Sequence, residues 1–317
     1  MSGRIDKQVL ILGAGPAGYA AAIYAARAML DVLMFAGPQP GGQLTITTDV
    51  ENYPGFAEPI QGPWLMEQMR AQVEHLGVDV HEDIALEADL SSRPFQITGD
   101  SGTKYAAQTL VIATGAEARW LGVPGEERYR GHGVSACATC DGFFFRDKEV
   151  VVVGGGNTAV EEALFLTRFA KRVRLLHRRD TLRAEQILQN RLFDNPKIEV
   201  VWNVVVEKII GSDSNPPQAS GVNIRNTQSG ETGTIEADGI FIAIGHLPAT
   251  DIFKGQLGMS NSGHIRINPP GSTTSVEGVF AAGDVADDTY RQAITAAGMG
   301  CIAALDAERF LASGKST

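Results

Sequence analysis

Two cysteines separated by two residues, Cys137 and Cys140, are the residues of this sequence best suited to chemistry. Such a pair can close a small disulfide, bind a metal, or cycle between dithiol and disulfide. A structural zinc site needs roughly four ligands, and the only other cysteine, Cys301, has no partner nearby in sequence. A purely structural disulfide is disfavoured because so short a loop restricts little chain entropy. The spacing therefore favours redox cycling without a metal, and Asp141 follows the pair directly.

Two glycine-rich segments bracket the cysteines. A buried-strand pattern at residues 9–12 runs into the sequence GAGPAG at 13–18, and a helical pattern follows to about Met29. A second buried strand, at residues 149–153, runs into GGGNTA at 154–159 and a helical pattern from about 157 to 169, and a further strand is expected over 232–244. Strand, Gly-x-Gly-x-x-Gly or Ala, and helix together are the dinucleotide-binding fingerprint, in which the glycines let a pyrophosphate approach the helix N-terminus.

The two segments differ at the end of their second strands, where an acid often holds the ribose. The first such strand ends in Phe35 and a glycine-rich stretch, so the ribose contact is expected from the loop at residues 37–43; a simple turn is the alternative. The second ends in His177-Arg178-Arg179, with Arg183 beyond. Arginines offer forked donors to a 2′-phosphate, which favours NADPH over NADH. A solvated basic surface is the plainer alternative.

A third candidate ligand segment lies near the C-terminal end of the sequence. Residues 279–285 form a strand pattern that ends in Gly283-Asp284. The Asp284 carboxylate can accept hydrogen bonds from the ribityl hydroxyls of a flavin, although a turn or cap role is also open. A long alanine-rich helix is predicted from about Tyr290 to Leu311, and free N–H groups at its start would suit the polar edge of an isoalloxazine ring.

An internal duplication organises the chain. The first glycines of the two segments are 141 residues apart, and each unit later repeats a strand-and-glycine ending, at 111–115 and 241–245. The sequence therefore predicts an α/β protein with two Rossmann-like nucleotide-binding domains, the second inserted in the first. The predicted boundaries are 1–117 and 247–317 for the outer domain and 118–246 for the inserted domain, which carries the cysteines.

Composition restricts the partners. The formal net charge of −10 argues against nucleic acid or an anionic membrane. No apolar run approaches the roughly 20 residues of a membrane span, and no cleavable apolar signal is expected at the N-terminus. Three cysteines among 317 residues fit a reducing cytoplasm, where a disulfide is more often catalytic than structural.

Taken together, these motifs resemble those of the bacterial low-molecular-weight thioredoxin reductases over the full length of the chain. The stretches that carry the resemblance are residues 13–18, 41–44, 51–55, 137–142, 154–159, 177–180 and 282–285. Tyr53, in a motif that often carries Trp, is a conservative departure. The resemblance implies FAD in the outer domain, NADPH in the inserted domain, and a homodimer.

The motif matches supply the candidate site residues. In the outer domain, the expected cofactor contacts are Gly13, Gly15, Pro16, Ala17, Gly18, Gly41, Gly42, Gln43, Leu44, Asn52, Ala113, Thr114, Gly115, Asp284, Arg291, Gln292 and Ala293. In the inserted domain, they are Gly156, Asn157, Thr158, Glu161, His177, Arg178, Arg179, Arg183, Ile244 and Gly245. The expected catalytic residues are Cys137, Cys140 and Asp141. No metal ligand is expected.

The resemblance implies a thioredoxin-disulfide reductase, in which electrons pass from NADPH through FAD and the cysteine pair to oxidised thioredoxin. In this family Cys140 faces the flavin, Cys137 attacks the partner, and Asp141 is placed to move protons. The alternatives are a related reductase or dithiol oxidase with another partner, and a catalytically silent nucleotide sensor. Because the nicotinamide and the cysteines both lie in the inserted domain and both must reach the flavin, we expect rotation about the crossings near 116–119 and 245–248.

Overall fold

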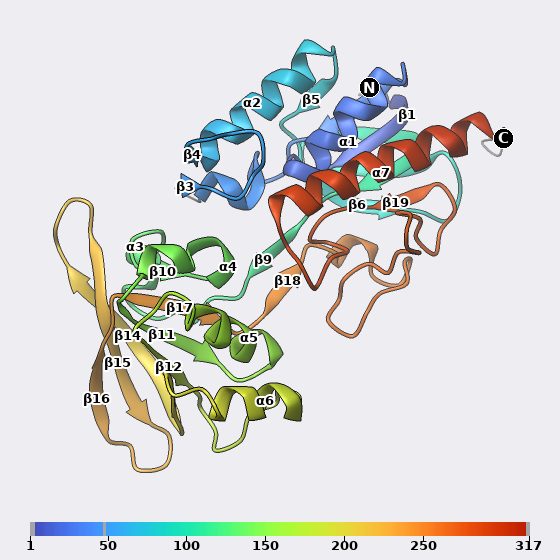
Figure 1. Ribbon diagram of the computed structural model, residues 1–317. Helices are drawn as coiled ribbons and strands as arrows, with labels where there is room; N and C mark the ends of the chain where they lie inside the picture. Colours follow the sequence, from blue (N-terminus) through green and yellow to red (C-terminus); the bar gives the residue numbers. More distant parts are fainter. Residues whose placement is uncertain (1–3, 47–48, 315–317) are drawn as a thin grey trace. The chain divides into compact units, whose positions relative to one another are not determined.

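The computed structural model describes residues 4–46 and 49–314 (Figure 1). The chain divides into two compact units: unit 1 comprises Met1–Glu117 with Leu247–Thr317, and unit 2 comprises Ala118–His246. The chain enters unit 2 along β9 (Ala116–Ala118) and leaves it along β18 (His246–Pro248). These two segments pair as a short sheet, so the entry and the exit of unit 2 lie side by side.

Unit 1 is built on a sheet with a parallel centre. Its parallel strands, in spatial order, are β5 (Asp79–His81), β2 (Val32–Phe35), β1 (Ile5–Leu12), β8 (Lys104–Ile112) and β19 (Val279–Ala281). β7 (Phe95–Gly99) and β6 (Ala85–Asp89) extend the sheet in antiparallel pairing beside the first half of β8. β19 pairs with the last residues of β8. A strand from the C-terminal part of the chain therefore lies next to the carboxyl end of β8.

Alternate strand residues of unit 1 pack on opposite faces of the sheet, as the two-residue period of a strand requires. Val9 and Ile11 belong to a core with helix residues, whereas Leu10 and Leu12 belong to a second core that includes Phe253. The helices of the first core are α1 (Pro16–Arg27), α2 (Gly62–His75) and α7 (Ala293–Ala312). α1 and α7 pack against each other (Figure 1), which their many alanines and glycines permit.

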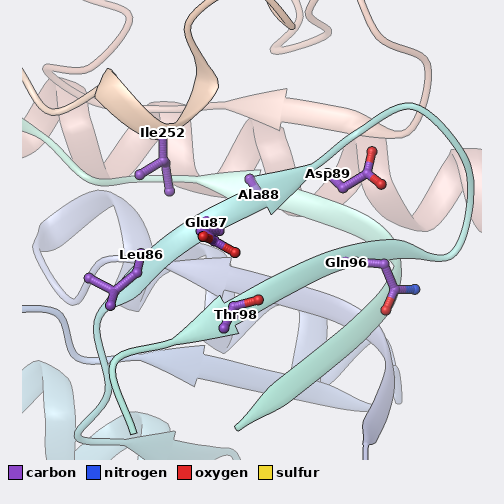
Figure 2. Close-up of a pocket in the computed structure, with 7 residues that line it drawn as sticks. All are labelled: Leu86, Glu87, Ala88, Asp89, Gln96, Thr98 and Ile252. Atoms are coloured by element: carbon purple, nitrogen blue, oxygen red, sulfur yellow. The ribbon is translucent and has the colours of Figure 1, made fainter. Parts of the chain in front are cut away.

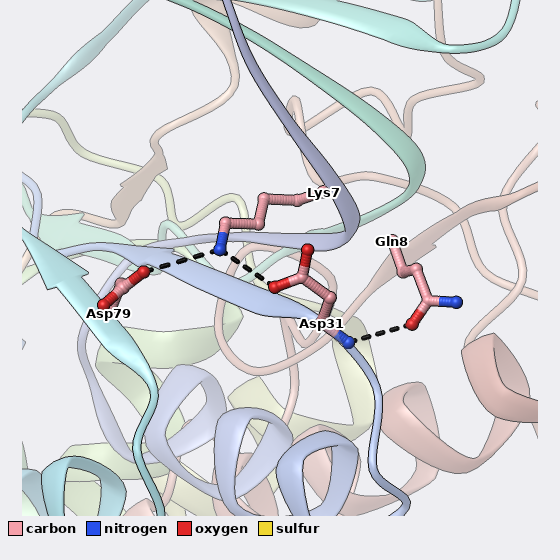
Figure 3. A network of polar contacts seen from close by, with 4 residues as sticks. All are labelled: Lys7, Gln8, Asp31 and Asp79. Atoms are coloured by element: carbon pink, nitrogen blue, oxygen red, sulfur yellow. Dashed lines mark hydrogen bonds and ion pairs between the residues drawn. The ribbon is translucent and has the colours of Figure 1, made fainter.

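Lys7 holds the end of the sheet opposite the glycine loop. Its ammonium group donates to the Asp31 carboxylate at 2.9 Å and lies 3.4 Å from that of Asp79 (Figure 3). The Gln8 side chain accepts a hydrogen bond from the Asp31 N–H at 2.9 Å. The hydrogen bond to Asp31 raises the pKa of Lys7, so the cation persists at neutral pH. These contacts tie β1 to the start of β2 and to β5.

Unit 2 repeats this arrangement. Its parallel strands, in spatial order, are β13 (Ile198–Val201), β12 (Arg172–Leu176), β11 (Glu149–Gly154), β17 (Gly239–Ala243) and β10 (Val134–Ser135). An antiparallel meander is formed by β14 (Val204–Ser212), β15 (Gln218–Asn226) and β16 (Thr232–Glu236), and unlike β6 and β7 of unit 1 it is a sheet of its own. The helices α5 (Asn157–Leu166) and α6 (Gln186–Phe193) belong to the core on one face, and the meander belongs to the core on the other.

The strand orders β5-β2-β1-β8-β19 and β13-β12-β11-β17-β10 are equivalent, which confirms the predicted pair of Rossmann-like folds. The shorter elements are η1 (Gly42–Ile46), β3 (Asp49–Val50), β4 (Ile60–Gln61), α3 (Glu126–Tyr129), α4 (Ala138–Asp141), η2 (Gly142–Phe145) and η3 (Asp251–Phe253). Among the described residues, no helix is both long enough and apolar enough to cross a membrane.

Three element boundaries differ from the sequence prediction. The strand expected over 232–244 is split at residues 237–238, because β16 pairs in the meander while β17 joins the parallel sheet. α7 begins at Ala293 rather than near Tyr290, since Arg291 has a φ of 49° that interrupts helical geometry. The helix expected from 157 to 169 ends at Leu166.

Candidate active site and nucleotide-binding loops

Glycines in the first loop allow backbone contacts that no larger residue would permit. A Cβ on Gly18 would lie 1.9 Å from the Gly13 carbonyl oxygen, and a Cβ on Gly13 would lie 2.3 Å from that of Ala113. Gly13 also has a φ of 108°, which favours glycine. The loop after β1, the start of α1 and the end of β8 therefore pack backbone to backbone. The structure thus brings the predicted segment 113–115 next to the first glycine of the fingerprint.

The N-terminus of α1 has open space in front of it. Gly15 is the N-cap, Pro16 occupies the first turn, and no described side chain caps the helix. That turn holds no acidic residue, and a Cβ on Gly15 would meet nothing within 4 Å. The N–H groups of a helix's first turn lack intrahelical partners and attract anions. This end of α1 therefore fits a pyrophosphate, as the fingerprint predicts.

The loop at residues 37–43, which was predicted to contact the ribose, lies against the first glycine loop. The Gly41 N–H donates to the Ala14 carbonyl oxygen at 2.8 Å, and a Cβ on Gly42 would be 3.6 Å from the Gly15 Cα atom. Gly41 and Gly42 have φ values of 92° and 64°, so two consecutive left-handed residues turn the chain into η1. Leu44, in η1, packs on the core that contains α1.

Asp284 reaches the same region from the end of β19. The preceding Gly283 approaches α1 so closely that a Cβ there would lie 2.9 Å from the Ala17 Cβ. Burial raises the pKa of Asp284 to about 6; the nearby Asp287 raises it further and Arg291 opposes the change. The side chain is thus a half-buried carboxylate at neutral pH that has lost part of its hydration, and it is suited to accept hydrogen bonds from ligand hydroxyls.

The start of α7 and a distant loop meet beside Asp284. Gln292 is the N-cap of α7 and forms a capping box with Thr295. The Asn52 side-chain amide donates to the Gln292 side-chain oxygen at 3.2 Å. Residues 240 positions apart in sequence are therefore neighbours, and Asn52 lies next to the segment of Arg291, Gln292 and Ala293, all of which the resemblance named as cofactor contacts.

Asp83 lies next to the segment that follows β2, where the sequence pattern lacks an acid to bind the ribose. Its backbone carbonyl accepts the Gly37 N–H at 3.2 Å. Its carboxylate accepts the hydroxyls of Ser101 and Tyr105 at 2.7 and 2.8 Å and the Ile84 N–H at 2.9 Å. Although burial alone would raise the pKa of Asp83, these hydrogen bonds hold it well below its usual range. Asp83 therefore anchors the sheet and does not replace the missing ribose ligand.

The second loop repeats the geometry of the first. A Cβ on Gly154 would lie 2.4 Å from the Ala243 carbonyl oxygen, just as Gly13 approaches Ala113. Gly156 caps α5 without a side-chain hydrogen bond from the described residues, and its Cβ would meet nothing within 4 Å. Asn157 is already engaged, because its side-chain oxygen accepts the Glu185 N–H at 2.9 Å. The space for a phosphate thus lies in front of Gly156 and Thr158.

Three arginines lie on the turn that follows β12, residues 178–183, which we call the arginine turn. Arg178, Arg179 and Arg183 are all exposed. Among the described residues none of them forms an ion pair, in contrast to Arg174, which binds Glu149 at 2.9 Å. The Arg183 N–H donates to the Gly155 carbonyl oxygen at 2.7 Å, which holds this turn against the glycine loop. Unneutralised guanidinium groups beside a phosphate loop fit a 2′-phosphate.

His177 lies beneath the glycine loop rather than in the open space before it. Its side chain is buried, and a Cβ on Gly155 would be 2.2 Å from the imidazole ring. The remaining predicted residues of unit 2 line the loop region less closely: Glu161 is exposed on α5 and Ile244 follows β17. Gly245 has a φ of 104°, and its carbonyl oxygen accepts the Arg119 N–H at 2.9 Å.

The cysteine pair forms a disulfide at the end of β10. Cys137 and Cys140 are bonded, with Cα atoms 5.3 Å apart. The short helix α4 begins at Ala138, and the N–H of Asp141 donates to the Cys137 carbonyl oxygen at 3.1 Å. Cys140 is exposed and Cys137 is half-buried. The structure thus confirms the predicted pairing, while Cys301 is a free cysteine on α7 in unit 1.

Ser135 is a member of this site that sequence reasoning missed. It is buried, and its hydroxyl accepts the Cys137 N–H at 3.0 Å. Burial raises the pKa of Asp141, and a hydrogen bond from Ser135 opposes that rise. One hydroxyl therefore fixes the backbone of the first cysteine and adjusts the acid that follows the second. Its place two residues before Cys137 was a signal, but serine alone has too many roles to predict this one.

A separate hollow in unit 1 is unsuited to a nucleotide. It has a volume of about 370 Å³ and lies between β6, β7 and Ile252 (Figure 2). Its charged lining residues are Glu87 and Asp89, which would repel phosphate. Within the described part of the chain, no group of three or more His, Cys, Asp or Glu side chains is arranged to hold a metal ion.

Comparison with known proteins agrees with this geometry. A family model for pyridine nucleotide-disulphide oxidoreductases matches residues 7–300. A thioredoxin reductase of Rickettsia bellii is 60% identical over 309 residues, covering 97% of this chain and 99% of that protein. The thioredoxin reductase of Coxiella burnetii is 54% identical and covers 96% of each.

A solved structure extends the likeness to three dimensions. The thioredoxin reductase from Giardia duodenalis superposes with a TM-score of 0.92 at 43% identity, covering 98% of this chain and all of that one. Close identity, near-complete coverage and a shared fold point to one conclusion. The chain belongs to the thioredoxin reductases, within the pyridine nucleotide-disulphide oxidoreductase family.

Proposed function

We propose that this protein is an NADPH-dependent thioredoxin-disulfide reductase with FAD in unit 1, NADPH in unit 2 and the Cys137–Cys140 disulfide as its redox centre. The disulfide supports this best. It follows the carboxyl end of β10, and the glycine loop follows the carboxyl end of β11 in the same parallel sheet. The chain also belongs to this family. When bound, FAD would supply two-electron transfer between the nicotinamide and the disulfide.

The residues of unit 1 fit FAD. The open N-terminus of α1 before Gly15 would hold the pyrophosphate, and the loop at Gly41 and Gly42 would cover it. The Asp284 carboxylate would accept hydrogen bonds from ribityl hydroxyls. The backbone at Gln292 and Ala293, at the start of α7, would face the polar edge of the ring system.

The residues of unit 2 fit NADPH. The N-terminus of α5 before Gly156 would hold the pyrophosphate. Arg178, Arg179 and Arg183 would bind the 2′-phosphate, since they are exposed and form no ion pair among the described residues. An NADH-specific site would instead place an acid at the end of β12, where this chain has His177.

The dithiol form would reduce thioredoxin by thiol–disulfide exchange. The Cys137 thiolate would attack one sulfur of the substrate disulfide, forming a mixed disulfide and releasing a substrate thiolate. Cys140 would then attack Cys137, re-forming the enzyme disulfide and releasing the second substrate thiol. Two electrons and two protons leave the enzyme, and Asp141, whose pKa burial raises, is placed to move a proton.

A protein substrate is supported by the surface next to the disulfide. Phe143 and Phe144, in η2, are 48% and 38% exposed. Exposed aromatic side chains are typical of protein–protein contact sites. We further propose that the enzyme is a cytoplasmic homodimer, as the cysteine content and the family resemblance imply.

We also propose that the units rotate relative to each other during turnover. The nicotinamide and the disulfide belong to the same unit, and each must approach the flavin, to roughly 3–3.5 Å for hydride transfer. The paired segments β9 and β18 are the crossings at which such a hinge would act. A cross-link between the units that stops turnover, and whose cleavage restores it, would support this rotation; full activity of the cross-linked enzyme would refute it.

The function is tested by NADPH consumption with a disulfide reagent, with and without thioredoxin. We expect a yellow protein that oxidises NADPH only when a disulfide is present and that passes electrons to thioredoxin. A dithiol oxidase would instead consume oxygen when given a dithiol and would show no thioredoxin-dependent NADPH consumption. A nucleotide sensor would bind both coenzymes without producing thiols.

A further inference from the structure

The imidazole of His177 stands between two backbone segments. It lies at the end of β12 and is only 6% exposed. Its Nδ1 atom is 2.8 Å from the carbonyl oxygen of Gly154, in the glycine loop, and its Nε2 atom is 3.0 Å from that of Thr181, in the arginine turn. The ring therefore bridges the loop that would receive the pyrophosphate and the turn that would receive the 2′-phosphate.

Both partners of this ring can only accept a hydrogen bond. A neutral imidazole carries one N–H and can satisfy one carbonyl, leaving a nitrogen lone pair facing the oxygen of the other. Only the imidazolium ion donates on both sides. The geometry of the bridge therefore matches the protonated ring, and the second hydrogen bond requires one more proton.

The surroundings oppose that proton while no ligand is bound. Burial lowers the pKa of His177, and Arg183 and Arg179 lower it as well, whereas the two carbonyls favour the cation. Two uncharged residues also contact the ring: Gly155 packs on it, and Trp202, after β13, meets it edge-on at 6.2 Å. Arg178 and Asp180, also on the turn, are exposed.

We propose that His177 is a proton-linked clamp for the 2′-phosphate: when the phosphate binds, His177 takes up one proton and donates to both the Gly154 and the Thr181 carbonyl oxygens. This inference rests on the proposed function, since it requires the 2′-phosphate to bind the arginine turn. The phosphate dianion offsets the positive charge of the arginines, which removes the main charge opposing the imidazolium. His177 is thus a positioning residue that favours NADPH over NADH without touching the nucleotide.

The clamp predicts proton uptake on coenzyme binding. Calorimetric titration of the FAD-loaded oxidised protein with NADP⁺, at pH about 7.5 in buffers of different ionisation heat, should show uptake approaching one proton. Because the complex holds the extra proton, affinity should fall as pH rises, by up to about tenfold per pH unit. Loss of the phosphate's own last proton (pKa about 6) would give the opposite sign, so it cannot mimic the effect.

The matched variants are His177→Asn, which cannot become a cation, and His75→Asn, an exposed histidine on α2 in unit 1. We expect His177→Asn to abolish the proton uptake and flatten the pH dependence, while His75→Asn behaves as the wild type. Equal proton uptake by the wild type and His177→Asn would overturn the clamp, even if NADP⁺ still binds tightly. Equal affinity for NADP⁺ and NAD⁺ in the wild type would instead overturn the proposed coenzyme site.

A second measurement does not depend on the variant folding. The chain has 6 histidines, so ¹⁵N-histidine labelling gives a small set of ring-nitrogen signals. We expect the ring of His177 to change from one protonated nitrogen to two when NADP⁺ is added. NAD⁺ should not produce this change. If no histidine gains a proton with saturating NADP⁺, the clamp is wrong.

Discussion

The two units have the same sheet order, yet they place different chemistry at the same topological position. In unit 1 the strand beside β8 is β19, which leads through Gly283 to Asp284. In unit 2 the strand beside β17 is β10, which leads through Ala136 to Cys137. A half-buried carboxylate that can hold a flavin and a redox disulfide are therefore equivalent in position, both at the carboxyl ends of parallel strands where ligands of such sheets bind.

A second difference separates the ends of β2 and β12. β2 is followed by Ala36 and Gly37, with no charged side chain, whereas β12 is followed by His177 and the arginine turn. The first glycines of the loops before these strands pack alike, since an added Cβ would lie 2.3 Å from the Ala113 carbonyl oxygen at Gly13 and 2.4 Å from the Ala243 carbonyl oxygen at Gly154. Under the proposed function, the glycine loops would bind a pyrophosphate in both units, and the strand ends would distinguish the nucleotide that each unit accepts.

The largest expected effect comes from removing the redox centre that only unit 2 carries. Cys140→Ser should lower the rate of thioredoxin reduction by about a thousandfold or more, since thiol–disulfide exchange requires both sulfurs. Reduction of the flavin by NADPH should remain, because that step needs no thiol. Stopped-flow flavin absorbance and a thioredoxin assay measure the two steps separately.

The matched control is Cys301→Ser, which removes the free cysteine on α7. It should leave both steps unchanged. If the flavin of Cys140→Ser no longer bleaches with NADPH, the proposed order of electron flow is wrong.

The next effect concerns the arginine turn that unit 1 lacks. Replacing Arg178, Arg179 and Arg183 by Gln should lower kcat/KM for NADPH by about a hundredfold to a thousandfold, since charge-assisted hydrogen bonds contribute about 1.5–3 kcal/mol each before non-additivity. The value for NADH should change by less than about threefold. Arg191→Gln, an exposed arginine on α6, is the control. Equal losses for both coenzymes would place the 2′-phosphate elsewhere.

A smaller effect separates the two glycine loops. Alanine at Gly15 or at Gly156 meets no protein atom within 4 Å, so the free energy of unfolding should stay the same or rise by up to about 1 kcal/mol. The added methyl group would nevertheless occupy the space of a phosphate. Gly15→Ala should weaken FAD alone and Gly156→Ala should weaken NADP⁺ alone, by about tenfold or more.

The contrast for these variants is Gly13→Ala, whose Cβ would clash with the Ala113 carbonyl oxygen and whose φ is positive. It should destabilise the fold itself. Flavin content, calorimetry with NADP⁺ and denaturant unfolding check the set. If Gly15→Ala retains FAD at wild-type affinity, the pyrophosphate does not bind at the start of α1.

Part of this structure could be predicted from the sequence alone. Both glycine loops, the cysteine pair and the nested α/β plan followed from local patterns, because strand, glycine turn and helix are contiguous in the chain. The hydrogen bond between Asn52 and Gln292 was not predicted, since contacts between residues 240 positions apart have no local periodicity; the resemblance named both residues only as cofactor contacts.

Other features depend on burial, which the sequence does not state. The role of Ser135 requires its hydroxyl to be enclosed beside Asp141, and the two-sided bonding of His177 requires a ring held beneath Gly155. The late start of α7 depends on the positive φ of Arg291, which is unusual for arginine. Each of these positions lies next to a candidate ligand site.

The last prediction tests Asp284 as the counterpart of the disulfide. Its folded pKa of about 6 lies above the unfolded value of about 3.9, so the folded state holds the proton more tightly. The unfolding free energy of the flavin-free protein should therefore decrease as pH rises from about 4 to about 6, by at most about 3 kcal/mol. Asp284→Asn has no carboxylate to ionise and should lack this decrease, making the variant the more stable protein at pH about 7.5.

The same variant should bind FAD less tightly, by about tenfold or more, because a neutral amide is a weaker acceptor for ribityl hydroxyls than a carboxylate. Stability and function thus oppose each other at this position. The exposed Asp288→Asn, on the same loop, should change neither property by a comparable amount. Denaturant unfolding at pH about 5 and about 7.5, with flavin titration, measures both. If Asp284→Asn loses stability equally at the two pH values, the carboxylate supports the fold itself and is not held there for the cofactor.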